Sequence, residues 1–175
     1  NVLAEVNDSA IIVSDRAELA GLSDEQIAGF AESAKEKNMP GKYRIALVNT
    51  TIQPILPQLD NRALRERIHK ASVARGARGN EWDNRAIVSK VTKLRAERAA
   101  IMGYPSYAAF SMAEETAKNP EAVNAMLEKM APPAVANARK EGAVLQAMID
   151  SEQKAKGEKT FALEPWDWSY YTEKV

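Results

Sequence analysis

The chain has 175 residues, of which 45% are hydrophobic and 27% charged, enough for a packed core without a compositional sign of disorder. It has no cysteine and one histidine, which excludes disulfides, thiolate catalysis and cysteine-ligated zinc or iron–sulfur sites. No apolar run approaches the roughly 18 residues of a transmembrane helix, no signal-peptide pattern opens the chain, and basic and acidic groups balance at 24 each.

Charge is unevenly distributed along the chain. Residues 61–103 carry 11 basic and 4 acidic side chains, between two net acidic segments, and such a block could form an anion-binding face. The basic residues alternate with a helical apolar period, so we interpret them as solvated helix faces that pair locally with Glu66 and Glu97. The arginines meant are Arg62, Arg65, Arg67, Arg95 and Arg98.

The N-terminal third predicts one helix between two β-forming runs. The first run is Ile11–Val13. Ser23 and Gln26 have the spacing of a capping box, and the helix that follows is expected to reach about Lys37, before the stop signals at 38–41. The best strand candidate is Tyr43–Val48.

From residue 61 the pattern is helical. Apolar residues at spacings of three and four predict helices ending near Gly76 and Gly103, separated by a polar loop over 76–83, and a shorter helix over 106–118. The residues that carry this period are Leu64, Ile68, Ala71, Ile87, Val91, Leu94 and Ile101.

The last third predicts a helix from Asn119–Glu121, a break or kink at Pro132 and Pro133, and a second long helix. A charged loop is expected over 151–160. The aromatic residues of Phe161–Val175 are interpreted as a core wedge, with Asp167 capping the helix that follows. These elements predict a mainly α fold with a minor β element near Tyr43–Val48.

The chemistry that the residues permit is limited. His69 is the one nitrogen ligand, and its helical neighbours supply one carboxylate, Glu66, so a zinc site with three protein ligands is not expected. We interpret His69 as an ordinary helix-surface or helix–helix residue. No nucleotide-binding loop and no serine elbow appears. The sequence therefore offers no catalytic residue and no metal ligand, and no substrate-binding residue is identified.

Three stretches together resemble a known family. They are 83–104, with Leu94–Tyr104 at its end, then Met112–Glu121, and then Glu164–Tyr171, which reads Glu-Pro-Trp-Asp-Trp-Ser-Tyr-Tyr. Their order and separation resemble the region ahead of the zinc helix in the thimet oligopeptidase and peptidyl-dipeptidase family of zinc metallopeptidases. The stretches 17–22 and 41–54 are similar to its dipeptidyl-carboxypeptidase branch.

The resemblance implies a helical, two-lobed zinc peptidase whose channel admits short peptides. In that family a His-Glu-x-x-His helix and a later Glu hold the metal, and the Glu between the two His activates water. This sequence has no such motif, so no catalytic or metal residue is carried over. The resemblance implies that these residues form a wall of the channel.

These inferences define what we expect of the chain. Residues 1–175 are expected to form a single helical, non-catalytic region of a larger chain, with a sub-boundary near 50–60, since Asn1 stands in place of Met and the last residues look helical. The parent is expected to be a zinc peptidyl-dipeptidase acting on short peptides, whose catalytic lobe is this region's partner. The segment alone is expected to bind no zinc, to be inactive and to self-associate through uncovered apolar surface.

Two further expectations concern partners and compartment. The alternative function is a helical interaction or nucleic-acid-binding module using residues 61–103, whose binding would weaken steeply with salt. No membrane partner is expected. A chain without cysteine suits the cytoplasm, which we expect, and also the periplasm.

Overall fold

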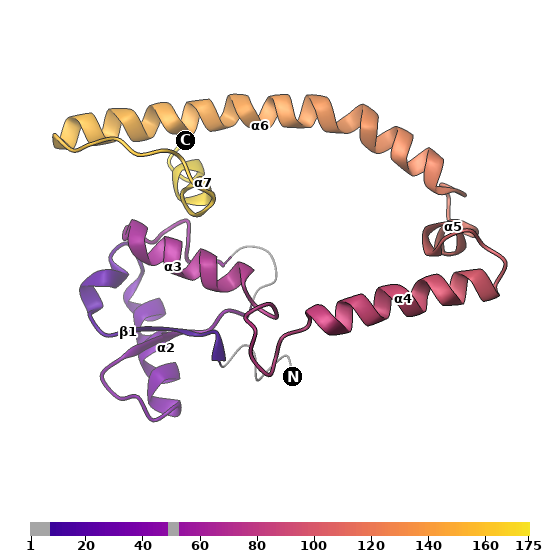
Figure 1. Ribbon diagram of the computed structural model, residues 1–175. Helices are drawn as coiled ribbons and strands as arrows, with labels where there is room; N and C mark the ends of the chain where they lie inside the picture. The colour runs from indigo at the N-terminus through magenta and orange to yellow at the C-terminus, as the bar shows by residue number, and fades with distance from the viewer. Residues whose placement is uncertain (1–7, 49–52) are drawn as a thin grey trace. The chain divides into compact units, whose positions relative to one another are not determined.

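The computed structural model describes residues 8–48 and 53–175, and most of them are helical (Figure 1). The elements are β1 (Ile11–Val13), the 3₁₀ helix η1 (Arg16–Leu19), α2 (Asp24–Glu36), β2 (Tyr43–Ile45), α3 (Arg62–Val73), α4 (Arg85–Ile101), α5 (Tyr107–Met112), α6 (Pro120–Lys156) and α7 (Pro165–Thr172). The expected mainly α fold with a minor β element is confirmed. None of the helices in the described ranges is long and apolar enough to cross a membrane.

The β element is a two-stranded antiparallel sheet. β1 pairs with β2 so that Ile11 lies opposite Ile45 and Val13 opposite Tyr43. The predicted strand ran to Val48, but β2 ends at Ile45 because β1 offers three residues for pairing. Residues 49–52 lie outside the described residues.

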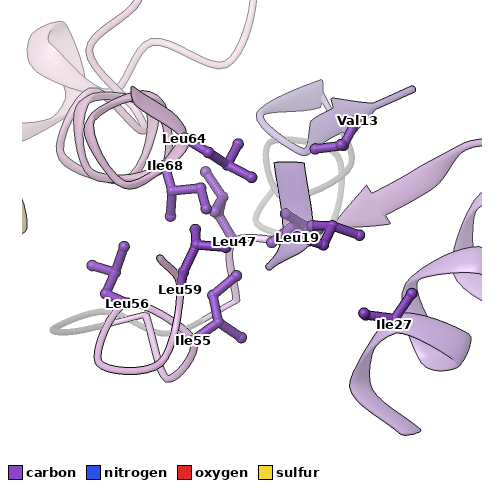
Figure 2. Packing of buried hydrophobic residues seen from close by; sticks show 10 residues of the cluster. Val13, Leu19, Ile27, Leu47, Ile55, Leu56, Leu59, Leu64 and Ile68 are labelled. Carbon is purple, nitrogen blue, oxygen red and sulfur yellow. The ribbon is translucent and has the colours of Figure 1, made fainter. Parts of the chain in front are cut away.

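One hydrophobic core unites the N-terminal elements. Figure 2 shows side chains from the sheet, η1, α2, the 53–60 segment and α3 converging on it. Its buried members are Val13, Leu19, Ile27, Ile45, Leu47, Ile55, Leu56, Leu59, Leu64 and Ile68. This core fixes α3 against the irregular 53–60 segment, and both carry residues of the site described below.

The predicted helix signals are largely confirmed. The capping box of α2 forms, since Ser23 Oγ accepts from the Gln26 amide at 3.2 Å and Gln26 Oε1 accepts from the Ser23 amide at 2.9 Å. Gly76 and Gly103 have φ of 71° and 79°, the left-handed conformation expected after a helix. Asn119 Oδ1 accepts from the Ala122 amide at 2.8 Å, which caps α6.

Two predicted boundaries are wrong. The helix expected over 106–118 covers Tyr107–Met112, and the chain then continues as turns, with Glu115 N donating to Met112 O at 3.0 Å. The loop expected over 151–160 begins at Gly157 (φ 70°), because Glu152 and Lys156 form a 2.6 Å ion pair one turn apart that supports the end of α6.

Of the break or kink expected at Pro132 and Pro133, the break is wrong, and no second helix begins there. α6 runs unbroken through both prolines and is drawn as one ribbon in Figure 1. Each proline removes one backbone donor, which leaves the carbonyls of Glu128 and Lys129 without an intrahelical partner. Both residues are exposed, so water can satisfy these carbonyls and the helix continues.

The described residues form two compact units. One contains the residues up to Asp83 together with Gly142–Val175, and the other contains Asn84–Glu141. α6 belongs to both. We expected a single helical region with a sub-boundary near 50–60. The division into two compact units does not test that domain assignment, which stays a prediction.

We predict opposite effects for two glycine-to-alanine changes. Gly21 has φ of 92°, and a Cβ there would lie 2.0 Å from Gln58 O, whereas a Cβ at Gly29 inside α2 meets nothing within 4 Å. Gly21→Ala should therefore lower the free energy of unfolding by at least about 1–3 kcal/mol, while Gly29→Ala should raise it by about 0.5–1 kcal/mol. Urea denaturation of the two variants measures both, and equal effects would contradict this account.

Candidate functional site: the Asp167 cluster and the adjoining pocket

The most buried charged group of the described residues is the carboxylate of Asp167, on α7. Its side chain is 0% exposed. Arg62 holds it from α3 through Nε (3.0 Å to Oδ2) and Nη2 (2.8 Å to Oδ2), and Arg65 through Nη2 (2.9 Å to Oδ1). Two guanidinium groups one helical turn apart therefore enclose one carboxylate, and we call these three residues the Asp167 cluster.

Arg65 is the buried arm of the cluster. Its side chain is 2% exposed. Besides Asp167 it reaches the 53–60 segment, since Nη1 donates to Leu59 O at 2.8 Å and to Asp60 O at 3.0 Å. Its guanidinium lies 4.0 Å from the centroid of the Tyr170 ring. A fixed fork of donors suits this task, because it satisfies the carboxylate and two backbone carbonyls at once.

Arg62 is the half-exposed arm. Its guanidinium lies 4.0 Å from the Phe161 ring centroid and 5.7 Å from that of Trp166, and Nη2 also donates to Ala162 O at 3.4 Å. Arg62 therefore covers Asp167 and packs on the aromatic residues before α7. The tilted ring of His69 lies 5.9 Å from Trp166 and extends this contact along α3.

A second carboxylate, Asp60, connects the cluster to the N-terminal core. The hydroxyl of Tyr170 donates to Asp60 Oδ1 at 2.7 Å, and the amide of Asp60 donates to Ala20 O at 2.9 Å. Gly21 lets the chain pass close to the 53–60 segment at this point. Three segments that are distant in sequence therefore meet at the cluster.

The last third of α6 packs against α7. Leu145 and Ile149 of α6 are buried together with Tyr170 and Tyr171 of α7. The indole ring of Trp168 packs closely on Gly142, since a Cβ added to this glycine would lie 3.3 Å from the ring. This confirms the interpretation of the aromatic residues as a core wedge. Asp167 caps α7 as predicted, but from the first turn of the helix: α7 begins at Pro165, Glu164 is the N-cap, and Asp167 accepts from the Glu164 amide at 3.3 Å.

Gln146 anchors the loop that leads from α6 to α7. Its amide nitrogen donates to Phe161 O at 2.9 Å and its amide oxygen accepts from the Leu163 amide at 2.7 Å. Hydrogen bonds from Gln146 and Thr160 lower the pKa of the Asp150 carboxyl below its ordinary value. The loop is therefore held in place by side chains of α6.

A pocket of about 550 Å³ lies beside the cluster, between α3, the 53–60 segment and residues 163–169. Its apolar walls include Leu56, Leu163 and Trp168, and its polar groups include His69, Ser72 and Glu164. A hydrogen bond of 2.9 Å from Gln53 Nε2 to Ser72 Oγ joins two of its sides. The size and lining suit an apolar side chain or a small ligand.

The polar groups of the pocket do not form a catalytic arrangement. Among the described residues, neither Ser72 nor Ser169 is hydrogen-bonded to His69, which instead packs on Trp166. Glu66, the carboxylate nearest to His69 in sequence, pairs with Lys70 at 2.6 Å. No group of three or more histidine and carboxylate side chains in the described ranges could hold a metal ion, so these residues do not fit a peptidase zinc site.

The interpretation of the basic residues of 61–103 as solvated and locally paired is confirmed in part: Arg67, Arg95 and Arg98 are exposed, whereas Arg65 is buried and the expected local pairs do not form. Arg62 and Arg65 bind Asp167, about a hundred residues away, and Arg67 pairs with Glu18 at 3.2 Å. Arg95 and Arg98 lie over the rings of Tyr107 and Phe110. The carboxylates expected to pair with them, Glu66 and Glu97, pair with Lys70 and Lys93 instead.

The signal that sequence reasoning missed was Asp167 itself. An aspartate among buried aromatic residues needs a cation, because an unpaired buried carboxylate is costly. Arg62 and Arg65, three residues apart beside the buried Leu64, could supply one.

Comparison with known proteins identifies the family. Residues 55–175 match the model of peptidase family M3. The chain is 38% identical over 99% of its length to dipeptidyl carboxypeptidase of Escherichia coli and 33% identical over 99% to oligopeptidase A of the same organism, covering 25% of each. It is also 29% identical to a probable cytosolic oligopeptidase A of Arabidopsis thaliana, of which it covers 25%.

These similarities place the chain in a peptidase family. It belongs to peptidase family M3, as the resemblance predicted. It spans about a quarter of the length of the curated relatives it matches.

We predict that Asp167→Ala strongly destabilises the fold. The change leaves the guanidinium of Arg65 buried without its counter-ion, which should cost about 3–5 kcal/mol in the free energy of unfolding. The control Glu66→Ala removes a carboxylate from an ion pair at the helix surface and should cost at most about 0.5 kcal/mol. Urea denaturation followed by circular dichroism measures both, and similar losses would contradict a special role for Asp167.

We predict that Tyr171 ionises above the ordinary pH range of a tyrosine side chain. Burial, with the Glu152 carboxylate nearby, raises the pKa of Tyr171 from 10.0 to about 12. Because folding favours the neutral phenol, its stabilisation is complete below pH 10 and is lost as the pH rises through 12. Ultraviolet absorbance of tyrosinate should show this late step, and Tyr171→Phe should remove it. A late step that persists in that variant would contradict the assignment.

Proposed function

We propose that this chain is part of a longer zinc-dependent peptidyl-dipeptidase that removes dipeptides from the C-terminus of short peptides. The observation that carries the proposal is the 38% identity to a dipeptidyl carboxypeptidase over 99% of the chain, against 33% to oligopeptidase A. The resemblance of the stretches 17–22 and 41–54 to the dipeptidyl-carboxypeptidase branch supports the same assignment. The cytoplasm is the proposed compartment.

The segment itself is proposed to be a non-catalytic scaffold that forms one wall of the substrate channel. Support comes from the use of its charged side chains: in the described residues, Arg62, Arg65 and Asp167 hold elements together. His69 and Ser72 are likewise engaged in packing and in a structural hydrogen bond. The zinc, its ligands and the water-activating glutamate are proposed to lie in the remaining part of the longer chain, which is the proposed catalytic partner lobe.

The alternative function, nucleic-acid binding through residues 61–103, receives less support. Phosphate binding needs arginine and lysine side chains that are available to a ligand. Arg62 and Arg65 are committed to Asp167, and Arg67 and Lys70 have carboxylate partners. The contacts therefore favour the peptidase proposal.

The test compares the longer protein with the 175-residue chain on N-terminally blocked tetrapeptides. We expect the longer protein to release the C-terminal dipeptide from a peptide with a free carboxylate, to cleave a C-terminally amidated peptide at least about tenfold more slowly, and to lose activity to a chelator until zinc is restored. The 175-residue chain with added zinc should release nothing.

Mass spectrometry of the products measures the site of cleavage. Internal cleavage without dipeptide release would contradict the peptidyl-dipeptidase proposal. Chelator-sensitive turnover by the 175-residue chain would contradict the assignment of the metal site to the remaining chain.

A further inference from the structure

The unit formed by Asn84–Glu141 exposes large apolar side chains on both of its long helical segments. Within these residues, all of which the structure describes, Ala99 is the one buried residue. Leu94 is 52% exposed, Met130 58% and Ile101 85%. Single exposed apolar residues are ordinary, but rows of them mark interaction surfaces in soluble proteins.

On α4 the exposed residues form a stripe. Ile87, Val91, Leu94 and Ile101 follow spacings of four, three and seven residues, which places them on one face of the helix. Arg98 lies on the same face, between Leu94 and Ile101, and α5 packs on α4 there, with Arg98 over the Phe110 ring and Arg95 over the Tyr107 ring. The stripe itself is left uncovered by the described residues.

α6 carries a second stripe, formed by the exposed Leu127 and Met130 with Met126 beside them and the half-buried Val123 one turn earlier. After Met130, residues at steps of four and three continue this face of α6. They are Ala134, Ala138, Gly142, Leu145 and Ile149. Leu145 and Ile149 are buried against α7. The exposed α6 stripe therefore lies on the same helix as Leu145 and Ile149, which form a packing interface with α7.

The charge of α4 indicates what kind of surface would pack on its stripe. α4 carries five basic side chains and one acidic side chain, Glu97, which pairs with Lys93. A surface that packs on α4 with charge complementarity would place acidic residues around an apolar centre. In the described residues of this unit the members of the α4 stripe are 40% to 85% exposed.

We propose that the α4 and α6 stripes are the docking face for segments of the same polypeptide that lie outside these 175 residues, with an apolar centre and an acidic rim. The inference rests on the proposed function, which makes this chain part of a longer peptidase. The relatives it matches are about four times as long, so each has three quarters of a chain that could cover these faces. The continuity with Leu145 and Ile149 favours such internal packing over a transient partner.

The test introduces one glutamate on each stripe, in the longer protein and in the 175-residue chain. The variants are Leu94→Glu and Met130→Glu, and the charge-matched controls are Ser89→Glu and Ala125→Glu on other faces of α4 and α6. In the longer protein the stripe variants should raise the rate of limited proteolysis by about tenfold or more, because each places a charge in a packed interface. In the 175-residue chain, where these positions are exposed, every variant should change that rate by less than about twofold.

Two outcomes would overturn the proposal. Stripe variants that behave like their controls in the longer protein would overturn the proposal. Stripe variants that only dissociate a dimer, as measured by light scattering, would show that a second copy covers the face and would also overturn it. Leu94→Ala and Met130→Ala give the same contrast with a smaller effect if the glutamate variants do not accumulate.

Peptide turnover of the same proteins is a separate readout. If the longer protein lacks peptidyl-dipeptidase activity but the stripe variants still become sensitive to protease, the proposed function fails and the docking face stands.

Discussion

The buried carboxylate of Asp167 constrains the N-terminal core and the C-terminal aromatic residues together. A charge that is 0% exposed is tolerated only when it is paired and hydrogen-bonded, and here two guanidinium groups and one backbone amide meet that need. Both arginines come from one turn of α3, about a hundred residues earlier. A buried ion pair of this kind adds little net stability over an apolar contact, but it tolerates few alternative partners, so it specifies which helices pair.

Arg65 and Asp60 extend this constraint to the rest of the unit. Arg65 satisfies two carbonyls of the 53–60 segment, and Asp60 accepts from Tyr170 while its amide bonds to Ala20. The close approach at Gly21 completes a path of contacts from the N-terminal core to α7. The bonds of Arg65 to Leu59 and Asp60 are local, but Arg65 reaches Asp167 102 residues away and Asp60 reaches Tyr170 110 residues away. The path as a whole therefore cannot form locally.

That distance explains what the sequence could and could not predict. Interactions within four residues were predicted well: the capping box at Ser23, the helix end at Gly103 and the cap at Asn119. The burial of Arg65 was not predicted, because the helical period places it beside Leu64 but does not indicate which residue it pairs with. The prolines of α6 were misread because their cost depends on whether water reaches the freed carbonyls, which tertiary structure decides.

The same reasoning separates the family assignment from the site. In the described residues, side chains able to do acid–base or nucleophilic chemistry, such as His69 and Ser72, are engaged in packing and structural hydrogen bonds. Geometry alone therefore gives structural contacts and a pocket but no family. The family came from similarity spread over the whole chain. Such similarity can be carried by side chains that position elements, as Asp167 does, without a single catalytic residue, because one misplaced helix in a channel wall would move every group that the helix supports.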